Sequence, residues 1–402
     1  MTIASNRDVV IVDAVRTPIA RGKAGGALSG VHPVDLLAQT LQHLVERNGL
    51  DPATVDDVLI GCVSQTGEQS ATPGRMAWLA AGYPAHVPAA TIDRKCGSSQ
   101  QAVSFAAQAI LADHADIIIA GGVESMSRVP MGSARAGADP YGQGIAERYA
   151  PGLTSQGVSA ELVAEKWGIS REEMDALALS SHQRAAATDF SREIVPVMTP
   201  DGLVTHDSTV RADTTLERLA TLDTVFRTDD LAARFPDVAW GVTAGNSSQI
   251  TDGASALLIM SAERAAAHGR IPRARVHTVT AVGDDPLLML TAPIPATHLV
   301  LRRAGLTIDD IDHIEINEAF ASVPLAWMRE FDVDPAKVNP RGGAIALGHP
   351  LGASGARIMT TMLHALEDTG GRYGLQLMCE AGGMANATII ERLDAGRRME
   401  GA

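Results

Sequence analysis

A segment near the start of the chain is repeated in its second half, and this repeat limits the folds that the chain can adopt. GLDPATVDDVLIG, residues 49–61, aligns without a gap on GLTIDDIDHIEIN, residues 305–317. Each copy predicts a helix that ends at glycine, a short acidic turn, and a strand in which apolar residues alternate. A fixed internal repeat is typical of duplicated units, so we expect two α/β halves of one plan.

The elements that follow each copy also match in order. After the first copy come a loop around Cys96, a predicted helix, QQAVSFAAQAIL, and a predicted strand, ADIIIAGG. After the second come NEAFA, the loop GGAIALGHPLGASG, a predicted helix, ARIMTTMLHAL, and a predicted strand, LQLMCEAGG. If the two halves pack about a pseudo-twofold axis, the starts of these two helices converge on one pocket.

The stretch between the halves has a different texture. Residues 129–157 are rich in Gly, Ala and Pro, which indicates loops, and residues 190–240 show only short, poorly periodic pieces. Between them a helix is predicted, with a possible capping box formed by Ser170 and Glu173. This stretch is predicted to be an insertion that covers a site. We expect the first half at 1–124, the inserted loop domain at 125–245, the end of the first half at 246–272, and the second half at 273–402.

Size and charge exclude several classes of protein. The chain has 402 residues, of which 46% are hydrophobic and 20% charged, so it has material for two or more domains. Its formal net charge of −14 argues against nucleic acid as the main partner. The longest apolar stretches fall well short of the roughly 20 residues that span a bilayer. The start, MTIASNRDVVIVD, lacks a charged region followed by an apolar one, so we expect a cytoplasmic protein with no membrane partner.

The three cysteines are Cys62, Cys96 and Cys379. Their odd number and the absence of Cys-x-x-Cys spacing indicate free thiols, with neither a disulfide framework nor a metal site. Cys96 stands among small residues at a predicted helix start. There the helix dipole favours the thiolate, and the backbone N–H can donate to a developing oxyanion. Free cysteines are also among the most often buried residues, so local context leaves both interpretations open.

Other candidate polar groups follow the second copy of the repeat. His349 lies in the glycine-rich loop, where a lone histidine is more often a structural hydrogen-bond partner than a catalyst. Cys379 ends a predicted strand, at the edge where open α/β sheets bind ligands, or it is simply a buried thiol. Asn317 and Glu318 of NEAFA lie at the same end. Glu318 could act as a general base, but we favour a role in holding a loop by hydrogen bonds.

Five segments, in this order, resemble the thiolases: DRKCGSSQQA, GNSSQITDGASALLIM, NEAFA, GGAIALGHPLGASG and CEAGGMANATIIERL. The resemblance runs from about residue 8 to 393. It implies a five-layered α/β/α/β/α fold of two similar halves with a loop domain inserted in the first. It also implies an acyltransferase that cleaves 3-oxoacyl-coenzyme A or condenses two acyl-coenzyme A molecules. Coenzyme A is then a co-substrate, no cofactor is bound permanently, and a homodimer or homotetramer is expected.

The resemblance also implies roles for individual residues. Cys96 is the nucleophile that carries the acyl group, and His349 takes its proton and later helps to hold a thioester oxygen. Cys379 exchanges a proton with the reacting carbon, and Asn317 positions a water beside that oxygen. The backbone N–H groups of Cys96 and Ala381 form a second oxyanion pocket.

Several positions depart from the family pattern or carry a weaker assignment. Ala381 stands where the family has glycine, which would add strain of about 1 kcal/mol if the backbone there needs a positive φ. Asp223 stands where some members place a basic residue near the nucleotide, so it would repel phosphate. Ser248 matches a serine near the pantetheine arm, and Phe320 either walls the acyl pocket or packs in the core. Ser99 replaces a frequent glycine, and Ser155 and Gln156 replace a histidine and a methionine of biosynthetic members.

Two alternatives to an active thiolase stay open. A ketoacyl-synthase-like condensing enzyme usually has a histidine in place of the second cysteine, so Cys379 counts against it. A non-catalytic relative that binds acyl-coenzyme A would need no nucleophile or base, so the four retained side chains count against it. The stretch GCVSQTGEQS and its surroundings resemble thiolases of fatty-acid or sterol side-chain breakdown, and this resemblance favours a degradative role. Cys62, which falls on the position of Glu318 in the repeat, is predicted to be structural.

Overall fold

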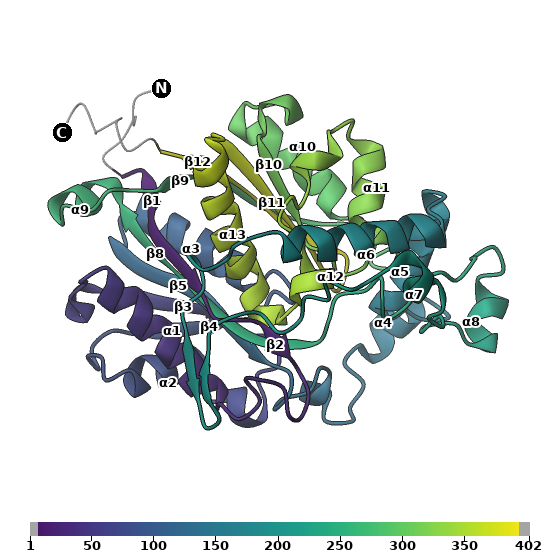
Figure 1. Cartoon of the computed structure of the whole chain (residues 1–402), viewed down its shortest axis with the longest axis horizontal. Coiled ribbons are helices and arrows are strands. Elements are labelled where there is room, and N and C mark those ends of the chain that lie inside the picture. Colours follow the sequence, from purple (N-terminus) through teal and green to yellow (C-terminus); the bar gives the residue numbers. More distant parts are fainter. Residues whose placement is uncertain (1–6, 394–402) are drawn as a thin grey trace.

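A computed structural model describes residues 7–393, and its centre is a ten-stranded sheet built from two half-sheets (Figure 1). The first half-sheet has the order β4-β3-β5-β8-β1, with β2 also paired to β8, and the second has the order β9-β12-β11-β10. They join where β1 pairs with β9 through only two residue pairs. The strands are β1 (Val9–Arg16), β2 (Ala20–Arg21), β3 (Asp57–Gly61), β4 (Ala89–Ile92), β5 (Ile117–Ser125), β8 (Thr251–Ser261), β9 (Ala274–Gly283), β10 (His313–Ile316), β11 (Tyr373–Glu380) and β12 (Met384–Arg392).

Helices cover both half-sheets and also fill the space between them. One apolar cluster packs α1 and α2 on the outer face of the first half-sheet. A second cluster joins both half-sheets through α3 and α13, and a third packs α10 and α11 on the outer face of the second half-sheet. The predicted α/β/α/β/α layering is therefore confirmed. The helices are α1 (Pro33–Arg47), α2 (Pro73–Ala80), α3 (Ser98–Leu111), α9 (Ala262–Ala267), α10 (Pro293–Ala304), α11 (Ser322–Glu330), α12 (Ala344–Leu347) and α13 (Ser354–Thr369).

The repeat is visible as two copies of the same turn. Gly49 follows α1 with φ 51°, and Gly305 caps α10 with φ 67°. Both glycines take the left-handed conformation that side chains disfavour, so each ends its helix cleanly. A 3-10 turn at Pro52–Thr54 or Ile308–Asp310 then leads into β3 or β10. Each of these strands pairs in parallel with the later strand of its half, β5 or β11.

The segment between β5 and β8 holds short elements, of which α4, α5, α7 and α8 lie at one side of the two halves (Figure 1). The predicted helix is α6, and its capping box of Ser170 and Glu173 is present. Residues of α5 and α6 share an apolar cluster with α11 and β11, so this part of the segment packs on the second half, whereas Val197 of β6 packs with α1 on the first half. The elements are α4 (Gly142–Arg148), α5 (Gln156–Lys166), α6 (Arg171–Ala186), β6 (Val197–Thr199), β7 (Gly202–Val204), α7 (Leu216–Ala220) and α8 (Asp229–Arg234). The domain bounds given above stay a prediction, and residues 1–6 and 394–402 lie outside the described residues.

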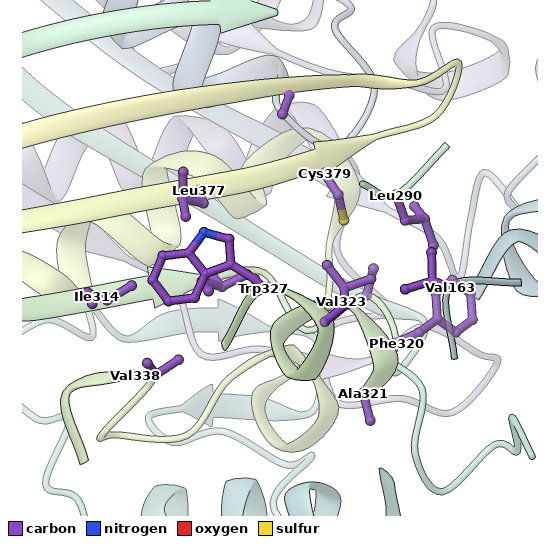
Figure 2. Close-up of a cluster of buried hydrophobic side chains, with 14 of the residues drawn as sticks. Val163, Leu290, Ile314, Phe320, Ala321, Val323, Trp327, Val338, Leu377 and Cys379 are labelled. Carbon is purple, nitrogen blue, oxygen red and sulfur yellow. The ribbon is translucent and has the colours of Figure 1, made fainter. Parts of the chain in front are cut away.

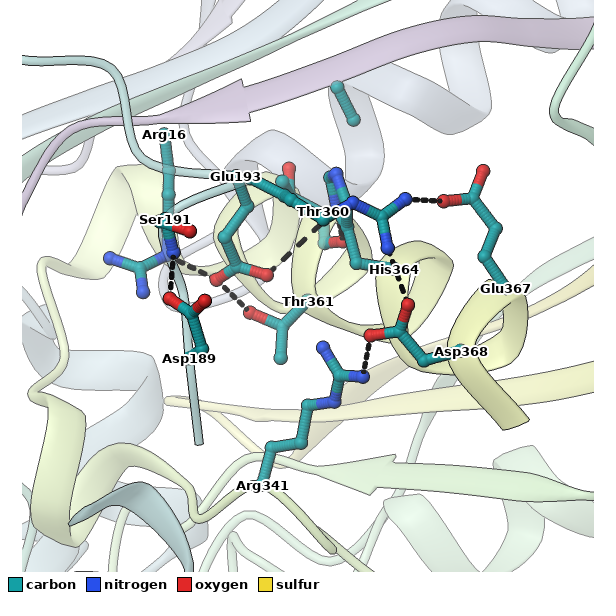
Figure 3. Close-up of polar contacts among 12 residues, drawn as sticks. Arg16, Asp189, Ser191, Glu193, Arg341, Thr360, Thr361, His364, Glu367 and Asp368 are labelled. Carbon is teal, nitrogen blue, oxygen red and sulfur yellow. Dashed lines mark hydrogen bonds and ion pairs between the residues drawn. The ribbon is translucent and has the colours of Figure 1, made fainter. Parts of the chain in front are cut away.

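A buried arginine attaches the same segment to β1. Arg16 is fully buried, and its guanidinium pairs with Glu193 at 2.5 Å and Asp207 at 2.8 Å. The carboxylate of Glu193 also accepts a hydrogen bond from Thr361 of α13, and Figure 3 shows Arg16, Glu193 and Thr361 together.

Within residues 7–393, no helix is both long and apolar enough to cross a bilayer.

Candidate active site

The starts of α3 and α13 lie against each other in the central layer. A Cβ added to Gly355 would overlap the backbone N of Gln100, so the two helix backbones approach closely there. Across this contact the Ser99 hydroxyl accepts a hydrogen bond of 2.9 Å from the N–H of Ala356. Ser99 therefore joins the two helices. The convergence of the helix starts, expected from the repeat, brings the Cys96 segment next to the His349 loop.

Cys96 lies two residues before α3 and is 4% exposed, packed with an apolar cluster that includes Met126 and Met378. Burial raises the pKa of its thiol to about 12, and the negative charge of Glu380 acts in the same direction. Hydrogen bonds from its own N–H, from the Gln156 side chain and from the Ala381 N–H oppose this rise in pKa. The resting group is therefore a neutral thiol, because desolvation outweighs the helix dipole.

Each ring nitrogen of His349 has one polar neighbour. Its Nδ1 lies 2.6 Å from the Ser354 hydroxyl oxygen, which itself donates to the carbonyl of Pro350. We assign the Nδ1–H tautomer on this basis, which leaves a lone pair on Nε2. Burial, followed by the positive charge of Arg357, lowers the pKa of His349 to about 3. The imidazole is thus a neutral acceptor facing Asn317, whose Nδ2 lies 3.4 Å from Nε2.

Cys379 is 1% exposed near the end of β11, and Figure 2 shows its sulfur pointing toward Val323 of α11. Burial raises the pKa of this thiol, and negative charge on Cys96 and Glu380 adds to the rise. The side chain of Asn317 donates a hydrogen bond that opposes it. Asn317 therefore contacts both the second thiol and the imidazole. Within the described residues its buried Oδ1 has no hydrogen-bond partner, so it retains a free acceptor.

Ala381 follows β11 and does not take a positive φ. The left-handed residues of this turn are Gly382 and Gly383, at φ 94° and 77°. The strain that would follow from alanine in place of glycine is therefore absent. The N–H of Ala381 reaches the Cys96 thiol, as does the N–H of Cys96 itself. Both predicted oxyanion donors thus converge on the same sulfur.

Phe320 packs in the same apolar cluster as Cys379, and Ser248 pairs with the residue before Phe320. Phe320 is 8% exposed and meets Phe226 edge-on, with ring centroids 5.9 Å apart. Gly157 makes room for the Phe226 ring, because an added Cβ would overlap it. Ser248 donates its backbone N–H to the carbonyl of Ala319 at 2.9 Å. The inserted segment and NEAFA are therefore packed together beside Cys379.

The remaining candidates have other surroundings. The carboxylate of Glu318 accepts hydrogen bonds from Ser181, Asn339 and the N–H of Ile345, so it holds a loop, as favoured above. Cys62 is fully buried, and burial raises the pKa of its thiol. Asp223 is exposed on the inserted segment.

Two groups near the sulfurs were missed by sequence reasoning. Gln156 departs from the pattern of biosynthetic family members, yet its amide reaches the Cys96 thiol. Glu380 is fully buried beside both cysteines. A signal for Glu380 was available: a carboxylate directly after Cys379, inside a predicted strand that is otherwise rich in apolar residues.

Comparison with known proteins identifies the family. A family model of the thiolase N-terminal domain matches residues 9–263, and one of the thiolase C-terminal domain matches residues 270–392. A steroid 3-ketoacyl-CoA thiolase of Mycobacterium tuberculosis is 51% identical, over 96% of this chain and 94% of its own. A beta-ketoadipyl-CoA thiolase of Escherichia coli is 46% identical, over 96% of this chain and all of its own.

Solved structures agree with these relatives. The crystal structure of the Bacillus anthracis acetyl-CoA acetyltransferase superposes with a TM-score of 0.85 at 37% identity, covering 96% of this chain and 99% of that one. The fold and the resemblance expected from the sequence are both confirmed. The chain therefore belongs to the thiolase family and is an acyltransferase.

Proposed function

We propose that this thiolase cleaves 3-oxoacyl-coenzyme A with coenzyme A, and that Cys96 carries the acyl group between the two halves of the reaction. The observation that carries the proposal is the convergence of two buried thiols, an imidazole and two backbone N–H groups. Cys96 meets the Ala381 N–H, and Cys379 meets Asn317, which in turn meets His349. A non-catalytic binding module has no need of this set of groups.

In the first step the Cys96 sulfur attacks the 3-oxo carbon while its proton passes to His349 Nε2. The bond between carbons 2 and 3 breaks, which leaves the shortened acyl chain on Cys96 and, on coenzyme A, the enolate of the fragment that contains carbons 1 and 2. A neutral imidazole is the form needed for the first transfer, and burial keeps the pKa of His349 low enough to maintain it. The sulfur is an apt carrier because thioester exchange is nearly balanced.

Cys379 then gives its proton to carbon 2 of the enolate. Asn317 is suited to assist, because its amide donates to the Cys379 sulfur and stabilises the thiolate left behind. Its unpaired Oδ1 is suited to hold a water beside the thioester oxygen of the enolate, with His349 on the other side. The N–H groups of Cys96 and Ala381, which lie near the Cys96 sulfur, would stabilise the tetrahedral oxyanion formed on the acyl group.

We infer a degradative role on 3-oxoacyl chains longer or bulkier than acetoacetyl. This rests on the relatives named for steroid 3-ketoacyl-CoA and beta-ketoadipyl-CoA thiolysis. Phe320 would wall the acyl group, and Ser248 would lie near the pantetheine arm. Coenzyme A would be a co-substrate with no permanently bound cofactor. Among the described residues, no group of three or more His, Cys, Asp or Glu side chains is placed to hold a metal ion.

We also propose a cytoplasmic homodimer or homotetramer. Three free thiols suit a reducing compartment. At one end of the sheet β4 pairs only with β3 among the described residues, and its side chains are partly exposed. Such an open edge is suited to pairing with a second copy of the chain.

The test is thiolysis of 3-oxoacyl-coenzyme A by free coenzyme A, measured as the loss of absorbance of the enolate form of the substrate. Substrates should run from acetoacetyl-coenzyme A to dicarboxylic and ring-bearing 3-oxoacyl thioesters. We expect turnover that is highest on one of the larger substrates. Cys62→Ala is the matched control, because it removes a buried thiol outside the proposed mechanism and should leave turnover unchanged. No turnover on any chain length would instead favour an acyl-coenzyme A-binding scaffold.

A further inference from the structure

The two halves carry one buried carboxylate each at equivalent positions. The first residue of β3 pairs with Ile118 of β5, and the first residue of β10, which is its equivalent in the repeat, pairs with Gly374 of β11. Glu124 follows Ile118 on β5 by the same number of residues as Glu380 follows Gly374 on β11. Both are fully buried. The pseudo-symmetry of the fold therefore makes them counterparts.

Glu124 is fully engaged with backbone and side-chain donors. Glu124, near the end of β5, ties the segment after β3 to the turn before α13. Its two oxygens accept hydrogen bonds of 2.9 to 3.0 Å from the N–H groups of Val63, Ser64 and Gly352 and from the side-chain amide of Gln69. Such a set of donors is what a buried carboxylate requires.

Glu380 has no comparable set. Neither of its buried oxygens has a hydrogen-bond partner among the described residues, although the N–H of Asn386 on β12 comes near enough to favour the anion. Its carboxyl group packs against Gly97, where an added Cβ would overlap it. The charged or titratable groups that face it are Arg94 and Cys96, from the segment before α3, and Cys379 on its own strand.

The donor equivalent to that of Glu124 does not reach Glu380. Helix α3 begins at Ser98 and its counterpart α13 begins at Ser354, so Cys96 is the equivalent of Gly352. The N–H of Gly352, from the second half, donates to Glu124 of the first half. The corresponding N–H in the first half, that of Cys96, lies near its own sulfur and does not bond to Glu380 of the second half. The carboxylate is therefore present in both halves, but only Glu124 receives the donor from the opposite helix start.

This arrangement has an electrostatic consequence. Burial raises the pKa of Glu380 to about 8, against the opposing charge of Arg94. A negative charge on Glu380 raises the pKa of both Cys96 and Cys379. An uncharged Glu380 removes this electrostatic part of the opposition to thiolate formation and leaves the effect of burial, whereas an ionised Glu380 adds to the effect of burial at both thiols.

We propose that Glu380 is a positioning residue that stays an uncharged acid during turnover, packed under the Cys96 turn, and that its ionisation suppresses thiolate formation at Cys96 and Cys379. The consequence for catalysis rests on the proposed function. The effect on thiol reactivity does not, because it concerns the free enzyme.

The test is the pH dependence of Cys96 alkylation by iodoacetamide, without substrate, in the full chain and in Glu380→Gln. Peptide mass spectrometry separates Cys96 from the other two cysteines. At about pH 7 both proteins should react at similar rates. At about pH 9.5 the variant should react about tenfold faster, since a like charge at short range shifts a thiol pKa by about one unit.

Glu124→Gln is the matched control, because it changes the counterpart carboxylate, and its alkylation profile should follow the unmodified chain. If Glu380→Gln folds poorly, Glu380→Met must show the same faster reaction at high pH. Parallel profiles for the unmodified chain and either folded Glu380 variant would overturn the proposal. An altered profile in a chain without thiolysis would uphold it and refute only the proposed function.

Discussion

Asn317 Nδ2 lies 3.4 Å from His349 Nε2, and the same amide donates to the Cys379 sulfur. One side chain thus joins the imidazole from the glycine-rich loop to the thiol of β11. Both contacts lie at the carboxyl end of β10, where the repeat strand gives way to NEAFA. The geometry makes Asn317 the point at which the acyl-transfer and proton-transfer groups meet.

Asn317→Ala removes a preorganised donor from the site. The kcat for thiolysis should fall by about 10² to 10³, because a lost donor to a developing charge costs about 3 to 4 kcal/mol. Steady-state kinetics with the preferred 3-oxoacyl substrate would measure it. A fall in kcat/KM caused only by a higher KM would show that Asn317 binds substrate without acting in the reaction.

Gly97→Ala should destabilise the fold by about 1 to 3 kcal/mol, because the new Cβ would overlap the Glu380 carboxyl group. Urea unfolding would measure the change in free energy. The cost should shrink when Gly97→Ala is made together with Glu380→Ala, which removes the overlapping atoms. Gly144→Ala is the control, since nothing lies within 4 Å of its added Cβ. An equal cost for Gly97→Ala in both backgrounds would contradict the packing described.

Arg16→Leu leaves the carboxylates of Glu193 and Asp207 buried without their cation. The free energy of unfolding should drop by about 3 to 5 kcal/mol. Arg192→Gln is the control, because that arginine is 57% exposed and pairs with Glu367 near the surface. Its effect should stay below about 1 kcal/mol. Similar losses in the two variants would mean that the Arg16 cluster in Figure 3 does not anchor the inserted segment.

Glu380→Gln should make stability less sensitive to pH. The folded-state pKa of Glu380, about 8, lies above the ordinary value near 4.3, so the folded chain holds the proton more tightly than the unfolded chain. The contribution of Glu380 to stability is therefore lost as pH rises from about 4 to about 8. At about pH 7 the variant should be more stable by on the order of 3 kcal/mol, and near pH 4 the two should coincide. A Tm difference that is constant across this range would be inconsistent with a buried neutral acid.

Much of the architecture follows from local sequence, because the repeat specifies its own elements. Gly305, the acidic turn and the alternating apolar residues of HIEI predict the helix end and the strand that the structure contains. The alternation does not reveal that the polar residues between the apolar ones, His313 and Glu315, are also buried. They face the central helix layer, and burial on both sides of a strand depends on packing between distant segments.

The site was predictable in its composition but not in its electrostatics. A helix start favours a thiolate at Cys96, yet burial raises the thiol pKa to about 12, and no local pattern measures desolvation. The backbone of Ala381 is likewise set by the turn around Gly382, which carries the positive φ instead. The contact between Arg16 and Glu193 joins residues far apart in the chain, so only the folded structure reveals it.

The most direct test of the account is the site of acylation in Cys379→Ala. This variant keeps Cys96, His349 and the oxyanion donors, but lacks the thiol that moves the proton on carbon. After mixing with an acyl-coenzyme A, peptide mass spectrometry should find the acyl group on Cys96, while thiolysis of 3-oxoacyl-coenzyme A stays absent. An acyl group on Cys62, or normal thiolysis by the variant, would contradict the account.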